Sequence, residues 1–477
     1  MSESNASVSL RRDGEAPQPV DLLITGADIV TFDDADTVLL NGAIAVRGNT
    51  ILWIGAGQEA SKLYSAKQTI NGSGTIAMPG LIDAHYHTGQ QLLRGKLAAM
   101  HGKHAAKSPH WKNYYVPFEC GLEPEDVYCS AIAGYTSMIS TGTTCFLEAG
   151  GPHPDEMGRA ANDVGIRGRI ALNTMDMDDT LPANYRMTTS QALKENEALV
   201  KRWKDHPRVN AWLSLRQIIV NTEELRIGMS HLAAELDTHI HTHLSEGTYE
   251  VDYSMENYGL RPPEYFEKLG IFNDRMHCAH SVLLTLPEIE LYAKHNVSIC
   301  HCAFGNYAIG YHQMFEMVRR NIRVGLGTDG PGGRCTLDLF EVAHFAVLGQ
   351  LIVNGTLYHA GPPIDYPEML KIACRNGARA ARMENKIGSL EAGKLADIVL
   401  VSSSDYDQYP VVDPLITLSE NSNGRDVRTV IVDGRIVMKD RQFISLDLEP
   451  MRLHVEKQYA SIMDRYNAQL DRSHTPH

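Results

Sequence analysis

Several histidines and carboxylates stand at positions where a metal site could form. His85 and His87 are separated by one residue and follow the apolar run at 81–84. On a strand, residues two apart point to the same face, so both imidazoles can reach one point beyond the strand end. Neutral imidazole is a strong ligand for divalent transition metals. The pair therefore predicts half of a metal site, with two solvated loop histidines as the alternative.

Four further polar residues lie at the ends of other apolar segments. His243 is followed three residues later by Glu246, His280 ends a later segment, and Asp329 stands in the sequence GLGTDG. Imidazoles combined with one carboxylate suit Zn²⁺ or Fe²⁺ better than Ca²⁺ or Mg²⁺. A lone histidine or aspartate at a strand end is usually a hydrogen-bonded loop residue. The joint placement of these residues is what favours a metal site.

Neighbouring histidines compete for the same roles. His239, His241 and His243 share one face of their predicted strand, and His277 precedes His280 by three residues. We choose His243 and His280 because they lie nearest the carboxyl ends of their strands. The other three are expected to lie deeper in the protein, in structural roles.

The elements that must position these residues alternate between apolar strands and helical stretches. The predicted strands are 78–85, 143–148, 167–173, 209–215, 238–244, 276–282, 297–302 and 323–328. This alternation predicts an α/β fold, a (β/α)8 TIM-like barrel, whose chemistry belongs at the carboxyl ends of the strands. An open doubly wound sheet is the alternative, but no phosphate-binding loop of the type Gly-x-x-x-x-Gly-Lys-Ser/Thr supports it.

The two ends of the chain have a different character. Short strand patterns with turn signals occur early and late in the sequence, and they predict one small β-sandwich domain built from both ends. The predicted division is a flexible tail at 1–19, the sandwich at 20–75 plus 390–445, the barrel at 76–389, and a C-terminal helix and tail at 446–477.

The composition excludes several classes of partner and location. The 477 residues carry a formal net charge of −14, which argues against binding to nucleic acid or to an anionic membrane surface. No apolar run approaches the length of a membrane span, and the polar start is no signal peptide. The scattered cysteines are typical of reduced thiols, so we predict a cytoplasmic protein.

Taken in order, the motifs resemble those of the amidohydrolase superfamily, in the branch of N-heterocycle aminohydrolases and triazine chlorohydrolases. The resemblance runs from about residue 20 to 445. It rests on PGLIDAHYH at 79–87, LRG at 93–95, HLSE at 243–246, AH at 279–280, Asn306, GTD at 327–329, and IGSLEAGKLAD at 387–397.

This resemblance implies one metal ion held by His85, His87, His243 and Asp329, with His280 near the metal and its water. Other branches hold two metals, bridged by a carboxylated lysine on the fourth strand. The segment 209–217 contains no lysine, which favours a single ion, Zn²⁺ with Fe²⁺ as the alternative.

The predicted activity is a metal-dependent hydrolysis in which hydroxide generated at the metal attacks an electrophilic ring carbon. Asp329 is expected to accept the proton of the water, Glu246 to carry it to the substrate, and His280 to orient the hydroxide. The alternative for Glu246 is a carboxylate that only orients a metal ligand.

The substrate is expected to be a small heterocyclic molecule. Candidate contacts are Gln90, Trp111, Arg216, Gln217 and Asn306, each with a structural role as the alternative. The loop 96–115, rich in histidine and lysine, departs from the acidic loop common in nucleoside-deaminating relatives. We predict that it controls substrate choice.

Hydrolytic deamination of an N-heterocycle is the predicted reaction. Dechlorination of a triazine-like ring, or hydrolysis of an amide, urea or carbamate bond, is the alternative, because the machinery is shared. A catalytically silent metal-containing binding protein is an alternative of another class. A homo-oligomer is expected.

Overall fold

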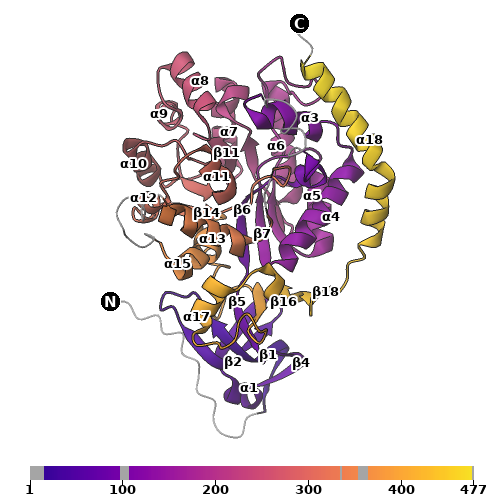
Figure 1. Ribbon diagram of the computed structural model, residues 1–477, viewed down its shortest axis with the longest axis vertical. Helices are drawn as coiled ribbons and strands as arrows, with labels where there is room; N and C mark the ends of the chain where they lie inside the picture. The colour runs from indigo at the N-terminus through magenta and orange to yellow at the C-terminus, as the bar shows by residue number, and fades with distance from the viewer. Residues whose placement is uncertain (1–15, 97–106, 334–335, 353–363, 475–477) are drawn as a thin grey trace.

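The computed structural model describes residues 16–96, 107–333, 336–352 and 364–474. Two parallel sheets with strand orders β6-β7-β8-β9 and β10-β11-β12-β13-β14 form the centre of the larger part (Figure 1). Their strands are β6 (Leu81–Tyr86), β7 (Thr143–Glu148), β8 (Arg167–Ile170), β9 (Val209–Ala211), β10 (Leu213–Leu215), β11 (Ile240–Leu244), β12 (Met276–His280), β13 (Ser298–His301) and β14 (Arg323–Leu326).

Backbone hydrogen bonds join the two sheets into one ring. Trp212 alone separates β9 from β10, and its N–H donates to the carbonyl of Ile170 at 3.0 Å. At the other joint, the N–H of Asp329 donates to the carbonyl of His85 at 2.9 Å. β9 and β10 are therefore one interrupted strand, β14 lies beside β6, and the predicted (β/α)8 barrel is confirmed.

Helices follow the strands along the chain and cover the outside of the ring. Two of them begin with a capping box, in which Thr188 and Thr285 accept backbone N–H groups three residues later. The helices of this part are α3 (Val116–Glu119), α4 (Pro124–Ser140), α5 (Pro154–Val164), α6 (Thr189–Trp203), α7 (Glu223–Glu235), α8 (Thr248–Tyr258), α9 (Pro262–Lys268), α10 (Leu286–His295), α11 (Ala303–Ile309), α12 (Met314–Val318), α13 (Leu339–Gln350), α15 (Tyr366–Lys371) and α16 (Gly377–Ala380).

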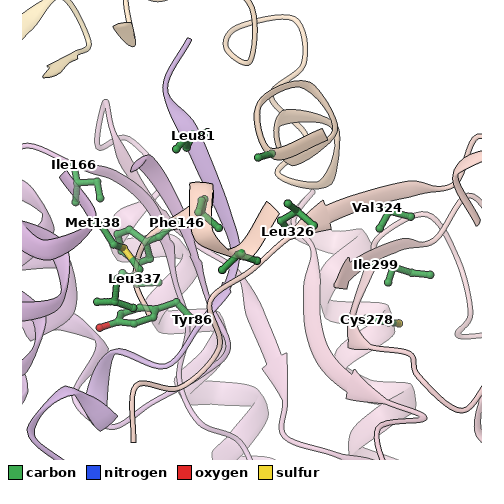
Figure 2. Close-up of a cluster of buried hydrophobic side chains, with 14 of the residues drawn as sticks. Leu81, Tyr86, Met138, Phe146, Ile166, Cys278, Ile299, Val324, Leu326 and Leu337 are labelled. Carbon is green, nitrogen blue, oxygen red and sulfur yellow. The ribbon is translucent and has the colours of Figure 1, made fainter. Parts of the chain in front are cut away.

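The main core fills the space between the barrel strands and these helices. Figure 2 shows part of it, with Leu81 and Phe146 on strands β6 and β7 and Met138 on helix α4. All three side chains are fully buried. Close packing of this kind holds the strands rigidly, and the strand ends are where the predicted site residues lie.

A nine-stranded sheet from both chain ends forms the smaller part, drawn below the barrel in Figure 1. Its strands are β1 (Gln18–Val30), β2 (Val38–Arg47), β3 (Thr50–Ala56), β4 (Tyr64–Asn71), β5 (Thr75–Pro79), β15 (Ile398–Ser402), β16 (Val427–Val432), β17 (Arg435–Lys439) and β18 (Gln442–Phe443). Ile24 and Ile44 from one arm share a buried cluster with Ile398 and Ile431 from the other. The β-rich part predicted from both ends is present.

The N-terminal boundary of the sheet differs from the prediction. Gln18 and Pro19 fall in the segment 1–19 predicted as a tail, but they pair in parallel with Tyr64 and Ser65. Strand β1 therefore starts two residues earlier than expected, because β4 offers it a partner that lies far along the chain. Residues 1–15 lie outside the described part, and the rest of the domain division stays a prediction.

At the other end of the chain, helix α18 (Glu449–His474) lies along the side of the barrel at α4 (Figure 1). His454 and Arg465 on this helix both pair with the buried carboxylate of Asp126 at the start of α4. Among the described residues, no helix is long and apolar enough to cross a membrane.

A buried ion pair links the barrel to the sheet, and its loss should destabilise the protein. Arg167 on β8 donates to both carboxylate oxygens of Asp397, at 2.9 and 3.0 Å, and to Asp433 at 3.1 Å. Arg167→Met leaves two buried carboxylates without a cation, which should lower the free energy of unfolding by about 3–5 kcal/mol. Denaturant unfolding measures this loss.

The matched control is Arg202→Met. Arg202 pairs with Asp155 at 2.7 Å, but both side chains are half exposed. Exposed pairs contribute about 1 kcal/mol or less. Equal losses of stability in the two variants would show that the link between barrel and sheet is not a major source of stability.

Candidate metal centre and active site

Strand β6 delivers the first pair of histidines to the carboxyl end of the barrel. His85 is on the strand and His87 follows directly, and both are buried. The buried carboxylate of Asp83 accepts hydrogen bonds from the N–H groups of His85 and Thr328, at 3.2 and 3.1 Å. Asp83 thus ties the first strand to the segment that carries Asp329.

The four side chains predicted as metal ligands converge at one point. His85 Nε2 and His87 Nε2 lie 3.5 and 3.7 Å from Asp329 Oδ1, and His87 Nε2 lies 3.1 Å from His243 Nε2. In a tetrahedral zinc site with bonds of about 2.0–2.2 Å, neighbouring ligand atoms are roughly 3.3–3.6 Å apart. These three separations are close to that range.

The hydrogen bonds of the histidine rings leave nitrogen atoms available to bind a cation. His85 Nε2 is buried without a hydrogen-bond partner. His243 Nδ1 donates to the carbonyl of Arg216 at 2.7 Å, so its Nε2 carries the lone pair in the neutral ring. His85 Nδ1 is held at 2.8 Å by His241 Nε2. These hydrogen bonds orient the rings so that their other nitrogens face the shared point.

The protonation states suit metal binding as well. Burial lowers the pKa of His85 to about 4, and it holds the pKa values of His87 and His243 well below the usual range. Burial alone would raise the pKa of Asp329, but the contact with His85 Nε2 and the nearby charge of His280 hold it below its ordinary value. Neutral imidazoles and an ionised carboxylate are the forms that bind a metal.

His280 reaches the same place from the end of β12. A donor atom of His280 lies within 4.8 Å of donor atoms of both His85 and His243. Asn306 Oδ1 accepts from His280 Nδ1 at 3.0 Å, while the Asn306 amide group contacts His301 Nδ1 at 2.9 Å. Asn306, predicted as a substrate contact, therefore holds His280 in orientation.

Two of these residues have unusual backbone conformations. His280 and Asp329 have φ angles of 67° and 63°. Residues other than glycine rarely adopt this left-handed backbone conformation, which costs on the order of 1–3 kcal/mol. Residues strained in this way cluster at functional sites. The strain is evidence, independent of the motifs, that the position of these two side chains matters.

The competing histidines make contacts with protein groups. His241 contacts His85 from behind, and His277 Nε2 lies 2.8 Å from the carbonyl of Ala84. His239 packs against Trp212, with ring centroids 5.0 Å apart. The assignment of His243 as the ligand from this strand stays a prediction that the geometry supports.

A cavity of about 600 Å³ opens beside the histidine cluster at the carboxyl ends of the strands. Its walls include three predicted catalytic residues and several aromatic side chains: Glu246, His280, Asp329, Trp111, Tyr249 and Phe304. Glu246 therefore lines the same cavity as His280 and Asp329.

The predicted substrate contacts differ in where they lie. Trp111 lines the cavity, and Gln217 donates to Glu246 Oε2 at 2.9 Å. Gln90 and Arg216 are buried and both bind the carboxylate of Glu119, at 2.7 and 3.3 Å. Their role toward a substrate stays untested, and the contacts that the structure shows are with protein groups.

Two polar residues of this region escaped the sequence prediction. Glu119 joins Gln90 and Arg216 beneath the site, and Tyr249 hydrogen bonds to Glu246. Glu119 belongs to no local motif and meets partners far along the chain. Tyr249 follows Glu246 by three residues at the start of α8, and that spacing was a signal that could have found it.

Within the loop 96–115, the structure describes residues 96 and 107–115. His101 and His104 lie outside the described residues, whereas Ser108, His110, Trp111 and Tyr115 of this loop line the cavity. Since the predicted ligand set takes nothing from the loop, His101→Ala combined with His104→Ala should leave metal content unchanged and alter relative activity among substrates. Elemental analysis and a substrate panel measure both; loss of metal would show that the ligand set is wrong.

The model of the amidohydrolase family matches residues 76–437 of the sequence. The chain belongs to this family. The amidohydrolase is 32% identical over 451 residues to the 5-methylthioadenosine/S-adenosylhomocysteine deaminase of Caldanaerobacter subterraneus subsp. tengcongensis, covering 93% of this chain and 99% of that protein. Family membership confirms the predicted class, a hydrolase that acts on carbon–nitrogen bonds other than peptide bonds.

Solved structures of similar fold are also hydrolases. An adenosine deaminase of Xanthomonas campestris, determined with bound zinc, superposes with a TM-score of 0.85 at 26% identity, covering 94% of this chain and all of that one. The atrazine chlorohydrolase of Arthrobacter aurescens TC1, complexed with zinc, gives a TM-score of 0.79 at 23% identity over 93% of this chain and 100% of that one. The second likeness shows the shared fold.

Proposed function

We propose that this amidohydrolase removes an amino group from a small N-heterocycle by hydrolysis, using one divalent transition-metal ion. The ion would be held by His85, His87, His243 and Asp329. The observation that carries the proposal is the convergence of these four donors beside the cavity that Asp329 and Glu246 line. The deaminase names of the similar proteins support the same reaction class.

Zinc is the proposed metal, because three nitrogens and one oxygen at these separations match its tetrahedral preference, with Fe²⁺ as the alternative. A zinc ion bound here would lower the pKa of water to about 7 and so make hydroxide available at neutral pH. Side chains of the protein carry out every other step of the proposed reaction.

Three of these side chains handle protons and charge. Asp329 accepts the proton of the attacking water, and Glu246 carries it to a ring nitrogen or to the departing amine. His280, with Nδ1 held by Asn306, presents Nε2 toward the attacking oxygen and stabilises the charge that develops there. All three line the cavity, so the proton never has to leave it.

The cavity walls favour a flat substrate. Trp111, Tyr249 and Phe304 line the space next to the acid–base group, and aromatic rings stack readily on planar heterocycles. The fourth strand, at 209–215, has no lysine that could bridge a second metal ion. A single ion beside an aromatic-walled cavity is the arrangement that supports ring deamination.

A panel of metal-loaded reactions tests the proposal. Purine nucleosides, purine bases, pterins, pyrimidines, aminotriazines and chlorotriazines are incubated with the protein, and ammonia and chloride are measured separately. Ammonia release in step with substrate loss is the expected result. Chloride release alone would assign dechlorination, and metal-loaded protein that turns over no member of the panel would support the silent binding protein.

A further inference from the structure

The hydroxyl group of Tyr249 stands at the centre of a small hydrogen-bond network beside Glu246. Trp111 Nε1 lies 3.0 Å from the Tyr249 oxygen, and Gln217 Nε2 lies 3.1 Å from it. The same Tyr249 oxygen is 3.1 Å from Glu246 Oε2. Tyr249 also lines the cavity, so this network forms part of the active-site wall.

Counting protons fixes the direction of every bond in the network. An indole N–H can only donate, and a phenol has one proton and two lone pairs. Gln217 must turn its nitrogen toward the carboxylate, because an amide oxygen 2.9 Å from an ionised carboxylate oxygen would set lone pairs against lone pairs. Trp111 and Gln217 then occupy both lone pairs of the Tyr249 oxygen, and its one proton has to point at Glu246.

The two oxygens of Glu246 are therefore unequal. Oε2 accepts from Gln217 at 2.9 Å and from Tyr249 at 3.1 Å. Within the described part of the chain, Oε1 has no hydrogen-bond partner. A proton on Oε2 would face two donors and would have to displace one of them, whereas a proton on Oε1 disturbs none of these bonds.

We propose that Tyr249 is a positioning residue which, together with Gln217, locks Oε2 of Glu246, so that Oε1 alone carries the catalytic proton. This inference rests on the proposed function. An O–H bond of water breaks as the new C–O bond forms, and its proton passes by way of Asp329 to Oε1 of Glu246. The proton then moves from Oε1 to the amino nitrogen, the C–N bond breaks, ammonia leaves, and Glu246 is again ionised.

The backbone supports the same arrangement. The N–H of Glu246 donates to Glu250 Oε2 at 2.8 Å, and Glu250 is fully buried. The main chain of Glu246 is thus fixed from one side and its Oε2 from the other. The remaining freedom of the side chain is small, and Oε1 is the atom left for the substrate.

Tyr249→Phe tests this role without changing the size of the ring. Loss of the hydroxyl should lower kcat by about 10- to 100-fold, as expected when an acid–base group is misplaced, and should change KM by less than about threefold. Tyr253→Phe is the matched control, because Tyr253 lies on the same helix and is not among the described residues that line the cavity. Its kcat should equal that of the wild type.

A double variant separates positioning of Glu246 from a general effect on the cavity. In a Glu246→Gln background, Tyr249→Phe should lower the residual kcat by less than about twofold, because no proton carrier is left to position. A full additional loss in the double variant, or an unchanged kcat in Tyr249→Phe alone, would overturn the inference.

Neutron diffraction from crystals in heavy water gives a readout that needs no turnover. The deuteron on Tyr249 should point at Glu246 Oε2, and Oε2 should carry none. A Tyr249 deuteron that points elsewhere would overturn the inference even if the enzyme deaminates. Conversely, if no substrate of the panel releases ammonia, the proposed function is contradicted. The position of the Tyr249 deuteron then still tests the hydrogen-bond network by itself.

Discussion

Replacing Glu246 with glutamine is expected to lower kcat by about two orders of magnitude or more, with folding and metal content near those of the wild type. The amide keeps the shape of the side chain but cannot accept and return a proton. General acid–base help of this kind contributes typically about 10²- to 10⁴-fold in rate. Steady-state kinetics on the best substrate of the panel, with elemental analysis of the same preparations, measures the effect.

Two outcomes would contradict this expectation for the Glu246→Gln variant. Glu246 lines the cavity, and the predicted metal ligands do not depend on it for their orienting hydrogen bonds. If the variant keeps most of its kcat, the proton carrier is another group. If it loses metal together with rate, Glu246 orients a ligand, which is the alternative role that the sequence left open.

Replacing His243 with alanine is expected to abolish both metal binding and activity. His243 Nε2 lies 3.1 Å from His87 Nε2, and its ring is held in orientation by the carbonyl of Arg216. The variant keeps only three of the four donors. We expect metal content far below the wild-type level after dialysis and a rate at background.

His239→Ala is the matched control on the same strand. His239 lies near Trp212, at the opposite end of β11 from Glu246. This variant should keep its metal and most of its rate. Loss of metal from the His239 variant, with metal retained in the His243 variant, would show that the wrong histidine of the three was chosen.

The sequence was sufficient for the parts of the site that follow from strand geometry. Alternation on a strand placed His85 beside His87, and the rule that barrel chemistry lies at the carboxyl ends of strands selected His243 over His239 and His241. These arguments need only the local pattern and the barrel. The structure brings the selected side chains within a few ångströms of one another, as that reasoning predicts.

The remaining contacts could not be predicted because they depend on how loops fold over the strand ends. Glu119 meets Gln90 across 29 residues and Arg216 across 97 residues of sequence. Tyr249 meets Trp111 across 138 residues. No local periodicity encodes such pairs, so the sequence marked Gln90 and Arg216 as polar without revealing their buried partner.

The start of the chain shows the same limit. Gln18 and Pro19 have no strong strand pattern of their own, and their pairing with β4 decides their conformation. A strand edge supplied by a distant segment overrides weak local preference. Boundaries set by such pairing can be found only once the sheet is known.

Metal titration of the chelated enzyme tests the central claim most directly. Zinc is added in steps to metal-free protein, and ammonia release from the best substrate is measured at each step beside the bound metal per chain. The account predicts no activity without metal and a linear rise that saturates at one ion per chain. Saturation at two ions per chain, or full activity in the metal-free protein, would contradict it.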